Sequence, residues 1–146
     1  MQAGSEPRGR GYAIVDPRRA ANLHDGTDVP GEFRQLTEAL GAQQLAVTMI
    51  RVPPHADFDR GTGHVHEEIE EIYLITRGTL TMRLGVDVVQ VRAPSVVRVD
   101  PQTPRSHRNE TGEPVEMWAL SRNINRSDST KIPGFWPPAP EHGPQL

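Results

Sequence analysis

The central part of the chain alternates apolar and polar residues in short runs. Leu80, Met82 and Leu84 alternate with Thr81 and Arg83, which is the two-residue period of a half-buried β-strand. The expected strands are residues 45–52, 72–75, 80–84, 86–91, 95–99 and 115–120. The links between them are short and favour antiparallel pairing, because parallel strands need long crossovers. The pattern therefore predicts an all-β fold of the sandwich or barrel type.

The two ends of the chain have a different pattern. Residues 1–11 are polar and glycine-rich, and we expect a disordered arm there. The predicted barrel domain spans residues 12–126 and is followed by a proline-rich tail over 127–146. The tail prolines exclude a central strand. We expect an extended tail that packs Phe135 and Trp136 back on the barrel, since a free tail has little use for two aromatic residues.

The segment in front of the central strands predicts only small elements. Short strands are expected at residues 12–15 and 33–36, and helical turns at 18–23 and 37–41. Gly41 would end the second of these turns. None of these elements is long enough to form a domain of its own.

Composition narrows the class of protein. The chain has 146 residues, the length of one ordinary domain, and 14 prolines and 13 glycines favour turns over long helices. No apolar run approaches the roughly 20 residues that span a bilayer, and the N-terminus lacks an apolar signal core, so we expect a cytoplasmic protein. The net charge is -3 with scattered basic residues, which argues against nucleic-acid binding. With no cysteine, a bound metal would have nitrogen and oxygen ligands.

Residues 63–78 contain two histidines and four glutamates, which are potential metal ligands. On a β-strand, His64 and His66 would point to the same face, roughly 6.5 Å apart, and could bind one ion. On a helix the same pair would diverge. The neighbouring Val65, Ile72 and Ile75 favour strand over helix.

A carboxylate follows the two histidines, and either of two residues could supply it. If one strand continued past His66, Glu70 would lie about 13 Å along it, too far to share an ion with bonds of about 2 Å. The chain must therefore turn within residues 67–70 and start a new strand near Glu71, which ends in a hairpin at Gly78. Neighbouring strand residues point to opposite faces, so only one of the two glutamates can be a ligand. Counting back from Gly78 favours Glu71, and counting forward from His66 slightly favours Glu70. We choose Glu71, because the strand behind it is rigid while the preceding turn can absorb an extra residue.

A second informative stretch covers residues 97–112. A strand runs into a proline-rich turn, then His107 and Asn109, before the last strand begins. Together with the first stretch, this order resembles the two motifs of the cupin superfamily. The resemblance implies a small antiparallel barrel of jelly-roll type, with one divalent ion held by His64, His66, Glu71 and His107. Three imidazoles and one carboxylate would leave one or two positions of an octahedral ion open, and Fe, Mn, Ni, Co or Zn would accept them.

The resemblance implies an enzyme more often than a passive protein. We expect a metalloenzyme acting on a small organic molecule, with dioxygenase-type oxidoreductase chemistry first among several reactions. The alternatives are a metal-dependent binding or sensing module and a scaffold whose metal is incidental. By analogy with cupins, and because an open barrel has edge strands to cover, we also expect a homodimer.

Two further residues are candidates for substrate binding. Tyr73 shares strand parity with Glu71 and either contacts substrate or packs in the core. Arg105, beside the proline-rich turn, either binds an acidic substrate or is solvated. The other histidines, His24, His55 and His142, are expected at the surface.

Overall fold

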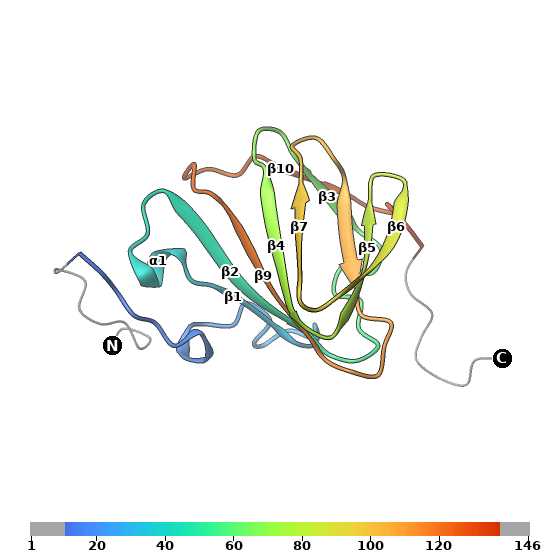
Figure 1. Ribbon diagram of the computed structural model, residues 1–146, viewed down its shortest axis with the longest axis horizontal. Helices are drawn as coiled ribbons and strands as arrows, with labels where there is room; N and C mark the ends of the chain where they lie inside the picture. The colour runs from blue at the N-terminus through green and yellow to red at the C-terminus, as the bar shows by residue number, and fades with distance from the viewer. Residues whose placement is uncertain (1–10, 138–146) are drawn as a thin grey trace.

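The computed structural model describes residues 11–137 and shows ten strands in two antiparallel sheets (Figure 1). The first sheet has the order β1-β2-β9-β4-β7 and the second β10-β3-β8-β5-β6. The strands are β1 (Glu32–Gln35), β2 (Leu45–Val52), β3 (Gly63–His66), β4 (Glu71–Arg77), β5 (Thr79–Leu84), β6 (Asp87–Arg92), β7 (Ser95–Val99), β8 (Arg105–Arg108), β9 (Val115–Arg122) and β10 (Ser129–Ile132). The all-β, antiparallel jelly-roll prediction is confirmed.

The core lies between the two sheets. In β4, Glu71, Tyr73 and Ile75 share the inner face, while Ile72 and Leu74 lie on the other face, as the pleat of a strand requires. The buried core residues are Ile50, Val52, Ala56, Tyr73, Ile75, Leu80, Met82, Val99, Val115 and Met117. A smaller cluster of Ala20, Leu36 and Met49, with Trp118 packed against it, is separate from this core.

The hairpin between β4 and β5 depends on glycine. Gly78 has φ +81, and a Cβ there would lie 2.4 Å from the carbonyl oxygen of Pro114. Only glycine accepts this conformation and this approach without strain. The predicted turn at this position is therefore confirmed, and it fixes where β4 ends.

The elements before the barrel are shorter than expected. The helical turn predicted at 18–23 is a 3-10 helix over Pro17–Arg19, and residues 12–15 make an isolated bridge at Ile14 instead of a strand. The second predicted turn is α1 (Thr37–Leu40), which ends at Gly41 with φ 66. The predicted 1–11 arm lies, except for Gly11, outside the described residues.

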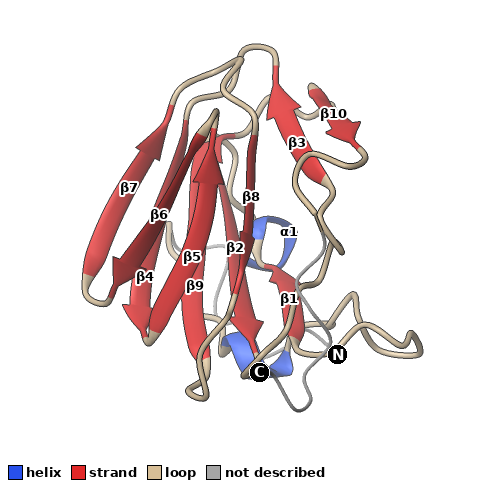
Figure 2. Ribbon diagram, turned by 90° about the vertical axis from the view of Figure 1, so that its right-hand side faces the viewer, coloured by secondary structure: helices blue, strands red, loops and turns tan. Residues whose placement is uncertain are grey.

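Two strands were not predicted. β8 forms where the sequence suggested only a turn, because Pro101 and Pro104 precede it and mask its short pattern. β10 lies in the segment predicted as an extended tail, and it occupies the sheet edge beside β3 (Figure 2), where prolines do less harm. The predicted packing of the tail aromatics is confirmed: Trp136 is buried, and the guanidinium of Arg108 lies 3.7 Å from its ring centre.

No helix in the described part of the chain is long and apolar enough to cross a membrane.

Candidate metal centre

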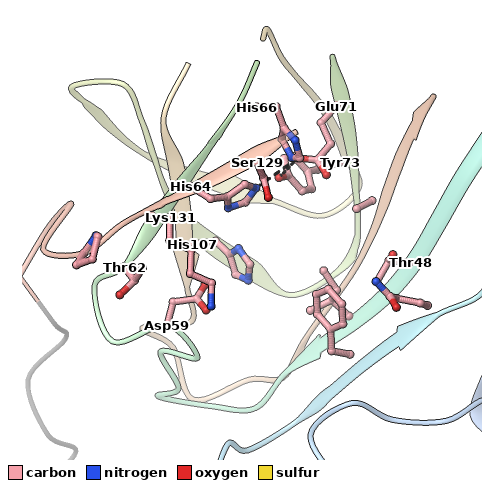
Figure 3. Close-up of a pocket in the computed structure, with 16 residues that line it drawn as sticks. Thr48, Asp59, Thr62, His64, His66, Glu71, Tyr73, His107, Ser129 and Lys131 are labelled. Carbon is pink, nitrogen blue, oxygen red and sulfur yellow. Dashed lines mark hydrogen bonds and ion pairs between the residues drawn. The ribbon is translucent and has the colours of Figure 1, made fainter. Parts of the chain in front are cut away.

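Two histidines and a carboxylate meet at one mouth of the barrel. β3 carries His64 and His66, whose ring centres are 5.0 Å apart, and the chain turns so that Glu71 starts β4 beside them (Figure 3). One ligand atom from each of the three lies within 4.8 Å of the other two. The nearest pairs are Nε2 of His66 and Oε1 of Glu71 at 3.5 Å, and Nε2 of His64 and the same oxygen at 3.8 Å.

The side chain of Glu70 is not part of this group and faces solvent. It is 56% exposed and sits 3.7 Å from the guanidinium of Arg98. The two neighbouring glutamates therefore face opposite sides, as strand geometry demands, and Glu71 is the one beside the histidines.

His107 shares the cavity with the other three residues but is not part of their close group. It sits on β8 opposite Met82 of β5, and its Nε2 is buried without a hydrogen-bond partner in the described part of the chain. Burial lowers the pKa of His107, so the ring stays neutral with a free lone pair. This is the state that a metal ligand needs.

The carboxylate of Glu71 is held in its ionised form. Burial raises the pKa of Glu71, but contacts with His64, His66 and Tyr73 outweigh it and hold the pKa well below its usual range. The hydroxyl of Tyr73 donates to Oε1 of Glu71. Burial raises the pKa of Tyr73 well above its ordinary value, so this hydroxyl remains a donor.

Arg105 is a buried residue, not a solvated one. Only 1% of it is exposed, and its Nε lies 3.8 Å from Oε1 of Glu71. It supports the carboxylate from behind, and it does not line the main cavity. The solvated alternative for Arg105 was wrong because β8, which was not predicted, turns the side chain inward.

The main cavity measures about 690 Å³ and opens over the ligands. Its polar lining includes Thr48, Asp59, Thr62, His64, His66, Glu71, Tyr73, His107, Ser129 and Lys131 (Figure 3). A smaller apolar cavity of about 300 Å³ adjoins it and shares Phe33, Asp59 and His107 as lining. His24 lines this second cavity between Phe33 and Phe58 and is not the surface residue that was expected, whereas His55 is exposed and His142 lies outside the described residues.

Sequence reasoning missed Asp128. Its carboxylate Oδ1 lies 2.6 Å from Nδ1 of His66, and its side chain is fully buried. No local pattern marks this residue, because its partner is 62 positions away in the chain. Ser129 and Lys131 were missed for the same reason: they reach the cavity only because β10 pairs with β3, opposite His66 and His64.

The fold is a small antiparallel barrel, and His64, His66 and Glu71 form a group of nitrogen and oxygen atoms that could hold a metal ion. The family model described as a cupin domain matches residues 48–121, and the chain belongs to this family. Comparison with curated proteins finds no match.

Solved structures with the same fold come from several bacteria. A cupin protein from Bacteroides fragilis is 17% identical with a TM-score of 0.63, covering 81% of this chain and 89% of that one. A predicted oxalate decarboxylase from Thermotoga maritima is 20% identical with a TM-score of 0.61, covering 76% and 99%. A sugar phosphate isomerase of the cupin superfamily from Silicibacter pomeroyi is 21% identical with a TM-score of 0.55, covering 64% and 60%.

Proposed function

We propose that this cupin binds one divalent metal ion through His64, His66 and Glu71, with His107 as fourth ligand, and acts as a metalloenzyme on a small organic molecule. The observation that carries the proposal is the close approach of the first three ligand atoms, all within 4.8 Å of one another, over an open cavity.

The donor set fits a first-row divalent ion. It supplies imidazole nitrogen and carboxylate oxygen and no sulfur, which suits Fe, Mn, Co, Ni or Zn. The unpartnered Nε2 of His107 gives the ion a further donor in the same cavity. When bound, the ion would act as a Lewis acid toward an oxygen atom of the substrate.

The residues around the ligands have separate roles. Tyr73 donates a hydrogen bond to Oε1 of Glu71, and Arg105 places a positive charge 3.8 Å from the same oxygen. Lys131 and Asp59 line the cavity and offer an ammonium and a carboxylate to polar groups of the substrate. A cavity of this size accepts a small molecule.

One fold supports many different reactions. Dioxygenase-type chemistry is our first expectation, and the neighbours described as a decarboxylase and an isomerase put both of these reactions into the test panel. The alternative is a non-catalytic module in which the metal helps bind a small molecule.

The first experiment measures metal content. Protein purified without a histidine tag and reconstituted with Mn, Fe, Ni or Zn should bind about one ion per chain, measured by elemental analysis. His66→Ala should abolish binding, and His55→Ala, which changes an exposed histidine, should not. Binding of only a small fraction of an equivalent by the wild type would refute the proposal.

The second experiment separates an enzyme from a binding module. The loaded protein is incubated with small acids, diols, phenols and sugar phosphates, with and without oxygen. Turnover of any of them that requires the metal supports the enzyme. A ligand-dependent rise in melting temperature without turnover would favour the binding module.

A further inference from the structure

Asp128 lies directly behind His66, on the side away from Glu71. One carboxylate oxygen, Oδ1, is 2.6 Å from Nδ1 of His66. The other oxygen accepts the backbone N–H groups of Glu68 at 2.9 Å and Ile69 at 3.0 Å. Both oxygens are thus in use, and none of the side chain is exposed.

The backbone around Asp128 is fixed from both directions. Its carbonyl accepts the N–H of Glu67 at 3.1 Å, and the next residue starts β10, which pairs with β3 along its length. Beyond β10, Phe135 packs so closely on Gly63 that a Cβ there would lie 2.6 Å from its ring. The carboxylate therefore cannot drift away from His66 without undoing this sheet edge.

The contact decides which ring nitrogen carries the proton. Oδ2 of Asp128 accepts two backbone N–H groups, and Oδ1 lies 2.6 Å from Nδ1 of His66. A carboxylate bonded in this way acts as a hydrogen-bond acceptor, so Nδ1 of neutral His66 donates to it. Nε2 then keeps its lone pair on the side of Glu71, 3.5 Å from Oε1.

We propose that Asp128 is a positioning residue of the metal centre, which fixes the tautomer and orientation of His66 so that Nε2 can bind the ion. The inference rests on the proposed function, because it concerns the same site. It also makes β10 part of the site, although this strand follows the cupin match at residues 48–121.

The substitution Asp128→Asn tests the tautomer with little change in shape. The carbonyl of the amide is needed by the N–H groups of Glu68 and Ile69, since turning the amide around would leave both donors unsatisfied. The NH₂ group must then face Nδ1 of His66, which has to accept. The proton moves to Nε2, and an ion can bind this nitrogen only after the proton has left it, which lowers the affinity.

The measurement has two readouts on the full chain. The imidazole ¹⁵N shifts of metal-free protein, recorded at about pH 9 where neutral imidazole prevails, report the tautomer, with the His66 signals assigned from a His66→Gln variant. Titration calorimetry with Zn²⁺ and with Mn²⁺ reports affinity. We expect Asp128→Asn to move the proton to Nε2 and to weaken binding about 10- to 100-fold.

The control is Glu68→Gln on the same turn. It removes one negative charge, and within residues 11–137 the carboxylate of Glu68 pairs with exposed Arg126. The tautomer should therefore stay the same, and the affinity should not change beyond about twofold. An unchanged His66 tautomer in Asp128→Asn overturns the inference, and so does a switched tautomer with unchanged affinity.

Failure of the proposed function gives a different result. A wild type that binds neither ion refutes the proposed metal site, while the tautomer of metal-free protein still reports on Asp128. If Asp128→Asn does not fold, the wild type decides: a proton on Nδ1 of His66 supports the inference, and a proton on Nε2 overturns it.

Discussion

Replacing Glu71 by Gln should damage the protein in two ways, because this carboxylate is both a proposed ligand and the counter-charge of a buried arginine. The matched control is Glu70→Gln, one residue earlier. Glu70 is 56% exposed and faces Arg98 on the surface. The pair therefore compares two identical chemical changes on opposite faces of one segment.

The expected loss of folding stability in Glu71→Gln follows from the distance between Arg105 and Glu71. Their closest charged atoms are 3.8 Å apart, which at an effective dielectric of about 20 corresponds to an attraction of about 4 kcal/mol. A neutral amide is easier to bury than a carboxylate, and this offsets part of the loss. We expect the metal-free variant to lose about 3 kcal/mol, the lower end of the cost of breaking a buried pair.

The assays are thermal melting and metal titration. A loss of about 3 kcal/mol should lower the melting temperature by about 10 °C in a chain of this size, and metal affinity should fall about tenfold or more. Glu70→Gln should cost less than about 1 kcal/mol and leave affinity unchanged. If Glu70→Gln weakens metal binding more than Glu71→Gln, the start of β4 is placed wrongly and the reasoning fails.

Two further predictions concern stability alone. Burial raises the pKa of Glu116, but Thr76 and Arg51 outweigh it and the pKa is lowered in the folded state, so its contribution is present above the unfolded pKa of about 4.3 and is lost as pH falls through the folded value. Glu116→Gln should therefore cost about 0.5–1 kcal/mol at pH 7 and almost nothing near about pH 2 in urea unfolding; an equal cost at both pH values would contradict this. Gly78→Ala should cost about 1–3 kcal/mol more than Gly85→Ala, since both residues have positive φ but only the first would place a Cβ against backbone. Equal melting temperatures for the two variants would show that the close approach at Gly78 is unimportant.

Local sequence patterns predict much of the fold. The apolar and polar alternation of 45–52, 80–84 and 95–99 predicts strands that the structure contains almost residue for residue. Such strands can be predicted from the sequence because the alternation reflects one buried face along a continuous segment. β8 and β10 carry little alternation, and they exist because neighbouring strands offer them hydrogen-bond partners.

In the candidate site, too, some features follow from the local sequence and others depend on the tertiary structure. The sequence by itself places His64 and His66 on one strand face and requires a turn before the next carboxylate, since spacing along a strand is a local property. It favoured Glu71 over Glu70 without excluding Glu70, and it left Arg105 with a solvated alternative. These questions depend on which strands lie side by side, and only the pairing of β4 with β7 and β9 and of β3 with β8 decides them.

Only the tertiary structure shows how the candidate ligands are supported. Tyr73 reaches Glu71 along its own strand, but Arg105 approaches from β8 and Asp128 from the segment before β10. Hydrogen bonds between residues 62 positions apart leave no periodic trace in a sequence. Local sequence thus determines most of the strands and the placement of His64 and His66. The packing of the two sheets decides which residues support each proposed ligand. Contacts across a barrel depend on strand register and not on spacing along the chain.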